Sequence, residues 1–322
     1  ERWSGKPYHP ISLFYREKFG GKVVKVPVSI ATDCPNRMGI KGAKVCIFCD
    51  QWGSFAYPDS RDNSLRTQIE EHRAKVGERF NARQFLVYFQ AYTTTFTQAA
   101  KLTEAFHTAL EYDDVAGIVL GTRPDCLSEA LLRTWRDFSE KTFLAIELGV
   151  QSFDDHELQW MERGHTALQA IKGIERVYNE TGIKPGLHLM FGWPTETDEQ
   201  IIHTAKICNA LPIHNVKLHN LHVLKHTPLE QLYNDGSFRP IELDAYAHRV
   251  GLFLQHLSPE IAVHRLVALS SKWEELIAPV WVRHKMRSYQ AVIDHLNDHG
   301  MYQGQFYSPS KATATELLLE GF

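Results

Sequence analysis

The sequence lacks long apolar runs, internal repeats and low-complexity tracts. None of its hydrophobic segments approaches the ~18 residues needed to span a membrane, so no membrane association is expected. An excess of charge of one sign is also missing, because 35 Lys and Arg residues stand against 38 Asp and Glu residues and the formal net charge is −3. Overall charge therefore gives no indication of nucleic-acid binding, although a local basic face remains compatible with it.

Cysteine is scarce as well. The chain of 322 residues contains five cysteines, namely Cys34, Cys46, Cys49, Cys126 and Cys208. An odd number in a chain of this length argues against a disulfide scaffold and indicates a reducing compartment, so we expect a cytoplasmic protein. Three of the five lie within sixteen residues of one another, which makes this cluster the most informative feature of the composition.

Short β-rich runs alternate with amphipathic helical stretches over the first two thirds of the chain. The expected strands are 26–31, 85–90, 116–120, 144–148, 186–191 and 216–221. Six β-then-α units in succession predict an α/β fold with a parallel sheet. The glycine-rich dinucleotide fingerprint of a doubly wound sheet is missing, and polar residues follow several different strands. These features favour a partial (β/α)6 barrel of the TIM type.

The alternation fades after about residue 225. We therefore divide the chain into an N-terminal extension (1–22), the partial barrel (23–225) and a small C-terminal extension on the substrate side (226–322). Pro228, Gly236 and Pro240 indicate a linker after the barrel, and a helix is expected over 242–257.

The loop after the first expected strand carries the spacing C-x11-C-x2-C at Cys34, Cys46 and Cys49. Three thiolates are one ligand short of a structural zinc site or of a four-cysteine iron–sulfur cluster. In a [4Fe-4S] cluster held this way one iron is open, and the amino and carboxylate groups of S-adenosyl-L-methionine (SAM) suit that position. An electron from the cluster would then cleave SAM to a 5′-deoxyadenosyl radical. The alternative interpretation is a zinc site completed by a distant histidine.

Further motifs support the iron–sulfur interpretation; they lie at 19–25, 34–37, 46–49, 88–93, 121–126, 147–152 and 163–166. Together they resemble the radical SAM superfamily, specifically its YhcC/YtqA-like branch, over nearly the whole chain. The motif Thr122-Arg-Pro-Asp125 and the stretch from Glu147 to Thr166 also resemble the radical SAM domain of the Elongator catalytic subunit, which modifies wobble uridines in tRNA.

The resemblance implies a [4Fe-4S] cluster on Cys34, Cys46 and Cys49, SAM as the second cofactor, and a reducing electron donor such as flavodoxin or ferredoxin. It places the SAM contacts near the strand ends, at Gln90, Ala91, Tyr92, Arg123, Glu147, Gln151, Arg163, His188, Met190 and Gly192. The sequence departs from the family pattern before Cys46, where Gly-Gly is usual, and at Gly121, where Elongator-like sequences tend to carry Glu. It also ends the second strand in Gln90-Ala91 instead of Gly-Gly-Glu.

Several of these residues have a second interpretation. Gln90 alternatively caps a strand end, and His188 is alternatively an interior barrel histidine. Arg163 alternatively pairs with Glu162 or Asp155 on a helix surface. Glu147 alternatively pairs with Arg123 inside the barrel.

Two cysteines remain outside the cluster motif. Cys126 is a candidate catalytic residue, as a hydrogen-atom donor or covalent site, with a small buried hydrophobic residue as the alternative. Cys208 lies on an apolar helix face and is expected to be inert. Among the histidines, His219 and His222 are expected on opposite faces of the sixth strand because side chains alternate, which argues against a shared zinc site.

The segment 264–287 interleaves five cations with two tryptophans, namely Arg265, Lys272, Arg283, Lys285 and Arg287 with Trp273 and Trp281. Cations and aromatic rings can hold phosphates and stack a flipped base, so tRNA is a candidate partner. The sequence therefore predicts a radical SAM enzyme that acts in tRNA wobble-uridine modification. Radical chemistry on a small metabolite or peptide is the alternative, followed by a non-catalytic metal-binding module.

Overall fold

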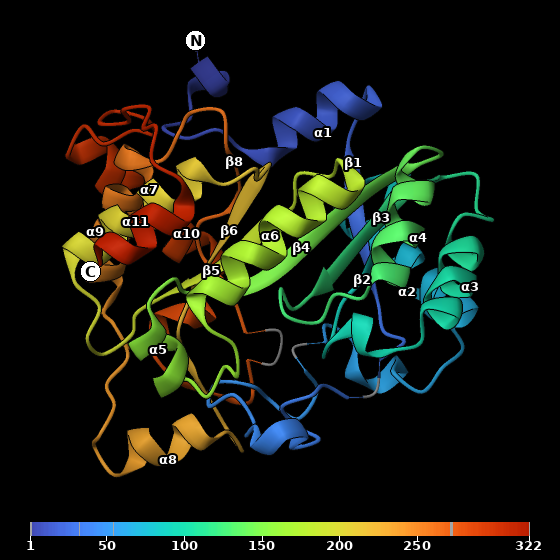
Figure 1. The fold of residues 1–322 in the computed structure, drawn as a ribbon, viewed down its shortest axis with the longest axis horizontal. Helices are drawn as coiled ribbons and strands as arrows, with labels where there is room; N and C mark the ends of the chain where they lie inside the picture. Colours follow the sequence, from blue (N-terminus) through green and yellow to red (C-terminus); the bar gives the residue numbers. More distant parts are fainter. Residues whose placement is uncertain (1, 32, 54, 271–272, 322) are drawn as a thin grey trace.

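A curled parallel sheet forms the centre of the computed structural model in Figure 1, which describes residues 2–31, 33–53, 55–270 and 273–321. Within these residues the sheet has seven strands in the order β1-β2-β3-β4-β5-β6-β8. Their bounds are β1 Val23–Val28, β2 Gln84–Phe89, β3 Val115–Thr122, β4 Phe143–Gln151, β5 Gly186–Phe191, β6 Asn215–Asn220 and β8 Ala262–Arg265. Each neighbouring pair is parallel, so the predicted partial α/β barrel is confirmed.

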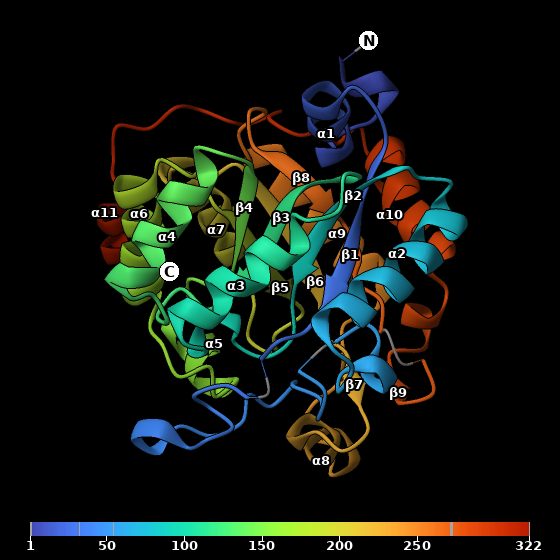
Figure 2. The same ribbon diagram turned by 90° about the vertical axis from the view of Figure 1, so that its right-hand side faces the viewer.

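Helices cover the outer face of the sheet (Figures 1 and 2). They are α2 Leu65–Phe80, α3 Ala99–Ala109, α4 Glu129–Ser139, α6 Ala167–Thr181, α7 Asp198–Ala210 and α9 Leu243–His256, while α5 Asp155–Trp160 lies beyond the end of β4. Polar side chains fix where several of them begin: Ser128 caps α4, and a reciprocal capping box between Thr166 and Gln169 opens α6. These caps satisfy backbone N–H groups that a helix start otherwise leaves unpaired.

The segment after residue 225 contributes a strand and a helix to the packing of the barrel. Its strand β8 pairs with β6 and completes the sheet, and α9 packs against α7. The expected linker contains α8 (Pro228–Asn234) instead. The remaining elements are the β7–β9 pair (Val223–Leu224 with Leu276–Ala278), α10 (Lys285–Asp298) and α11 (Ala314–Glu320).

The N-terminal helix α1 (Ile11–Phe19) closes the end of the barrel where the strands begin (Figure 2). Tyr15 and Phe19 pack with Leu86, Tyr88 and Val119 in an apolar cluster inside the sheet. Access to the barrel interior is therefore from the opposite end, where the strands finish. None of the helices described is long and apolar enough to cross a membrane.

Candidate active site

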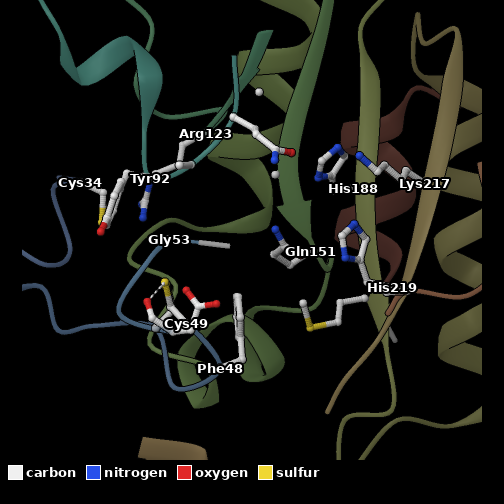
Figure 3. Close-up of a pocket in the computed structure, with 18 of the residues that line it drawn as sticks. Cys34, Phe48, Cys49, Gly53, Tyr92, Arg123, Gln151, His188, Lys217 and His219 are labelled. Carbon is white, nitrogen blue, oxygen red and sulfur yellow. Dashed lines mark hydrogen bonds between the residues drawn. The ribbon is translucent and has the colours of Figure 1, made fainter. Parts of the chain in front are cut away.

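A cavity of about 360 Å³ lies at the end of the barrel where the strands finish. One wall consists of the cysteine-bearing loop after β1, and the other of residues from β4, β5 and β6 (Figure 3). Cys34, Cys46 and Cys49 all line this cavity. Nine of the ten predicted SAM contacts line it as well: Gln90, Ala91, Tyr92, Arg123, Glu147, Gln151, Arg163, His188 and Met190.

Each thiol of the cysteine loop faces an N–H donor. The Arg37 backbone N–H lies 3.5 Å from the Cys34 Sγ, and the Arg37 guanidinium lies 3.5 Å from the Cys49 Sγ. Cys46 faces two donors, the Asn36 side-chain amide at 3.4 Å and Arg163 Nη1 at 3.7 Å. Hydrogen-bond donors and cations of this kind favour thiolates over thiols, and in Cys49 the Arg37 guanidinium acts against burial, which raises the pKa of that thiol.

Cys34, Cys46 and Cys49 offer the thiolate ligands that a [4Fe-4S] cluster takes. No group of three or more His, Cys, Asp or Glu side chains in the described ranges converges as the ligands of one ion do. When bound by Cys34, Cys46 and Cys49, such a cluster supplies an electron for the reduction of SAM.

The end of β2 turns into the cavity through an unusual backbone. Ala91 and Tyr92 both have positive φ angles, of 84° and 50°. Gly53 of the cysteine loop lies against this turn, and a Cβ atom placed on it would come within 2.6 Å of the Tyr92 backbone nitrogen. Left-handed backbone at non-glycine residues is costly and tends to cluster at functional sites. The turn therefore supports a binding role for residues 90–92.

Arg163 and Gln151 lie together beside the cysteines. Arg163 donates from Nη2 to the Gly149 carbonyl at 2.6 Å, so its proposed surface pairing with Glu162 or Asp155 is wrong. Glu162 instead pairs with Lys44, and Asp155 accepts from a backbone N–H. The Gln151 side-chain oxygen is buried and has no hydrogen-bond partner in the described chain. A ligand hydroxyl at this position would satisfy it.

Arg123 supports the cysteine loop. Its Nε and Nη2 donate to Asp125 at 2.9 and 2.8 Å, and its Nη1 donates to the Asn36 side-chain oxygen at 2.6 Å. Asn36 in turn contacts Cys46 and donates to the Glu162 backbone carbonyl at 2.8 Å. All three nitrogens of the guanidinium are therefore engaged, and Arg123 acts as a positioning residue for the loop in this state.

Glu147 lies at the centre of a buried ionic network deeper in the barrel. Its carboxylate accepts from Lys25, from Lys217 at 3.2 Å, from His188 at 2.8 Å and from the Tyr88 hydroxyl at 2.8 Å. The alternative pairing of Glu147 with Arg123 is therefore wrong. Burial opposes ionisation of Glu147, but Lys217 and Lys25 hold its pKa well below the usual range.

Three cations were not expected here: Lys217 and Arg265 line the cavity, and Lys25 lies behind Glu147. Lys25 is the one charged residue of the otherwise apolar strand β1, which is an available sequence signal, whereas Lys217 lies in β6 among Asn and His residues and stands out less. Burial lowers the pKa of Lys217 to about 7 and that of His188 to about 4, in each case against the opposing effect of Glu147. His188 is thus a neutral interior histidine that also lines the cavity.

Gly192, Cys126 and Cys208 lie outside the cavity lining, whereas His222 lies within it. Gly192 is not part of the cavity lining, and a Cβ atom there would meet Ile241 at 3.0 Å. Cys126 also lies outside the lining, and burial raises the pKa of its thiol to about 11. Cys208 is fully buried, as expected. His222 lines the same cavity as His219, because β6 ends at Asn220 and the alternation of side chains ends with it.

The segment 264–287 does not form a single face of cations and aromatic rings. Arg265 lines the barrel cavity, and the Trp281 side chain donates to the Ile241 carbonyl at 3.1 Å. Trp273 is exposed, whereas Lys272 lies outside the described residues. Some residues of the expected face therefore lie inside the barrel, and others lie on the surface.

A curled parallel sheet with a three-cysteine loop at the strand ends defines a radical SAM enzyme. The sequence profile of the Radical SAM superfamily matches residues 28–208, and that of the Radical SAM C-terminal domain matches residues 213–298. The chain belongs to the Radical SAM superfamily. Members of this family use SAM and a [4Fe-4S] cluster in general.

Two bacterial relatives match nearly the whole chain. YtqA from Bacillus subtilis is 33% identical, with 94% of this chain and 93% of the relative covered. YhcC from Escherichia coli K12 is 30% identical, with 88% and 90% covered.

Solved structures show the same fold at low identity. Archaeal Elp3 from Methanocaldococcus infernus superposes with a TM-score of 0.60 at 16% identity, covering 87% of this chain and 64% of that one. A radical SAM methyltransferase from Sphaerobacter thermophilus superposes with a TM-score of 0.52 at 14% identity, covering 78% and 68%.

Proposed function

We propose that this protein reductively cleaves SAM at a [4Fe-4S] cluster held by Cys34, Cys46 and Cys49, and that the resulting 5′-deoxyadenosyl radical acts on a wobble uridine of tRNA. The observation that carries the chemistry is the three-thiol loop at the mouth of the cavity. Arg37, Asn36 and Arg163 direct N–H donors at the thiols and would stabilise them as thiolates.

The other residues of the cavity have distinct parts in this proposal. Gln151, with its unpartnered buried oxygen, would accept a hydrogen bond from a SAM ribose hydroxyl. Gly149 and Cys46 engage part of the Arg163 guanidinium. The remaining part would face the SAM carboxylate. Tyr15 and Phe19 of α1 form an aromatic plug at the far end of the barrel. This plug would keep water from entering there and so protect a reactive radical.

The substrate part of the proposal is supported by local sequence similarity. A protein named tRNA uridine(34) acetyltransferase from Dehalococcoides mccartyi is 29% identical over 127 residues, which are 38% of this chain and 27% of that protein. Because a fold hosts many chemistries, this similarity has to be tested on the reaction itself.

The test is anaerobic reconstitution of the cluster followed by quantification of 5′-deoxyadenosine with SAM and dithionite. Bulk tRNA from cells lacking the gene is added in one arm, so that the precursor nucleoside is present. We expect tRNA to increase 5′-deoxyadenosine at least several-fold and to gain a nucleoside of altered mass. Slow cleavage unaffected by this tRNA would contradict the tRNA substrate and favour a small molecule or peptide.

The cluster assignment has its own test. The variant Cys46→Ala should retain well below the about four irons per chain of the reconstituted wild type and should not cleave SAM. Cys126→Ser is the matched control, because that thiol lies outside the cavity lining, and it should retain full iron. Iron and sulfide analysis decides the matter, and one zinc per chain in place of iron would contradict the proposal.

A further inference from the structure

The interior of the barrel below the cysteines carries more cations than carboxylates. Lys25, Lys217 and Arg265 project into it, and in the described part of the chain Glu147 is the carboxylate that the two lysines share. Glu147 binds both ammonium groups, as well as the Tyr88 hydroxyl and the His188 ring. One carboxylate therefore pairs with two lysine ammonium groups.

Arg265 is left without an acidic partner. Its Nε donates to the Leu218 carbonyl at 3.2 Å and its Nη2 lies 2.6 Å from His219 Nδ1, but no carboxylate of the described residues lies within 4.0 Å of the guanidinium. A guanidinium does not lose its proton in a protein, so its charge persists in this interior. Charges withdrawn from water without a partner are unfavourable and are rarely retained without a function.

The neighbouring histidines do not balance this charge, because an imidazole is neutral or positive. Burial and adjacent cations hold the pKa of His219 and of His264 well below the usual range, so both rings are neutral at physiological pH. The same cause lowers the pKa of Lys217 to about 7. Burial first, and the neighbouring cations second, therefore disfavour further protonation of this interior.

The unpaired cation is open to the cavity. Arg265, Lys217 and His219 belong to the same cavity lining as the cysteines, and Figure 3 shows Lys217 and His219 on the side opposite Cys34 and Cys49. The α1 plug closes the far end of the barrel. A molecule that enters past the cysteines therefore ends its path at these cations.

We infer that Arg265 and Lys217 bind an anionic oxygen group of the substrate, a carboxylate or a phosphate, at the end of an arm that reaches into the barrel. A guanidinium fork matches either group through two parallel hydrogen bonds, and an ammonium supplies a second charge. On the proposed function, on which this substrate assignment rests, the uridine presented to the radical carries an acidic substituent.

The first test uses simple anions as probes. The reconstituted protein is titrated with sodium acetate or with inorganic phosphate at constant ionic strength, and its melting temperature is measured anaerobically. We expect at least one anion to raise the melting temperature by a few degrees, because a ligand of the folded state stabilises it. The acetate and phosphate arms distinguish a carboxylate-bearing from a phosphorylated substrate.

Two variants locate the effect. Arg265→Gln should lose most of the anion-induced shift, whereas Arg136→Gln, which removes a cation from the exposed surface of α4, should keep it. Without added anion, Arg265→Gln should melt no earlier than the wild type, because it removes an unpaired charge; this result shows that the variant folds. An equal shift in all three proteins, or none in the wild type, would overturn the inference.

A second test uses a matched pair of ligands, a uridine with a carboxylate arm at C5 and the corresponding primary amide. We expect the wild type to bind the acid at least tenfold more tightly and Arg265→Gln to discriminate less. An anion effect that depends on Arg265 without stimulation by tRNA would retain this inference and refute the tRNA substrate. Stimulation by tRNA without any anion effect would retain the tRNA substrate and refute this inference.

Discussion

At the scale of single residues, the site combines backbone strain with close approach of side chains. Ala91, Tyr92 and Gln151 all line the cavity and all have positive φ angles. Each such residue costs about 1–3 kcal/mol, which the surrounding fold has to offset. Gly149 leaves room for Arg163 and Gln151, because both side chains lie where a side chain on Gly149 would be.

The substitution Gly149→Ala tests this arrangement. Its Cβ atom would lie 2.9 Å from Arg163 Nη2 and 3.0 Å from Gln151 Nε2, so both side chains would have to move. We expect SAM affinity to fall about tenfold, equivalent to ~1.4 kcal/mol, while the protein remains folded. Equilibrium SAM binding measures the change. Gly21→Ala, whose Cβ atom meets nothing within 4 Å, is the control, and equal affinities in both variants would refute the role of Gly149.

The sequence allowed prediction of part of this site. Cysteine spacing and motifs point to Cys34, Cys46, Cys49 and Arg163, because their pattern is local. Asn36 and Arg37 lie inside the same loop, but their contacts with the thiols depend on how the loop folds back. Lys25 and Lys217 are separated by almost the whole barrel in sequence, and only closure of the sheet brings both to Glu147.

At the scale of elements, a buried pair of acidic residues joins α5 to the loop before α7; the pair consists of Glu157 and Glu196. Glu157 accepts a hydrogen bond from Ser152 and lies near Glu196, which is held by Arg249. Burial, together with the charge of Glu196, raises the pKa of Glu157 from its usual 4.5 to about 8. The folded state therefore holds a proton that the unfolded chain releases at a lower pH.

This shift predicts a pH dependence of stability. Between about pH 4.5 and pH 8 the folded state binds more protons than the unfolded state, so the free energy of unfolding should decrease as pH rises. Glu157→Gln should flatten this dependence and be more stable than the wild type at pH 8 by ~1 kcal/mol or more. Urea unfolding at several pH values measures both slopes. Glu180→Gln, in an exposed pair with Arg176, should keep the wild-type slope, and parallel slopes in all three proteins would contradict the assignment.

Another element-scale prediction concerns the aromatic plug of α1. Phe143 at the start of β4 contacts the rings of Phe14, Tyr15 and Phe19, with ring centroids 6.2, 6.3 and 5.2 Å away. Phe143→Ala should lower the free energy of unfolding by about 2–4 kcal/mol, because it removes these contacts and leaves a cavity. The more exposed Phe80→Ala should change it by less than about 1 kcal/mol in the same urea titration. Similar losses in both variants would show that α1 does not depend on this ring.

At the scale of the whole molecule, the two ends of the chain hold each other in place. Gln303 is fully buried, donates to the carbonyls of Ser258 and Ile261, and accepts from the His9 backbone N–H. The sequence predicted six strands but not β8, because a four-residue strand has too few positions to show a period. Its place in the sheet is set by pairing with β6, a contact between distant segments.

This arrangement predicts that the barrel does not fold without its C-terminal part. A chain of residues 1–225 would lack β8, Gln303 and the helix α9, whose Tyr246 and Phe253 are fully buried, so β6 would be left as an open edge. We expect this chain to aggregate or to show no cooperative thermal transition by circular dichroism. A chain of residues 1–310, which loses α11 but keeps β8, Gln303 and α10, should still unfold cooperatively at a lower temperature. A soluble 1–225 chain that melts cooperatively near the full-length temperature would show instead that the barrel is an independent domain.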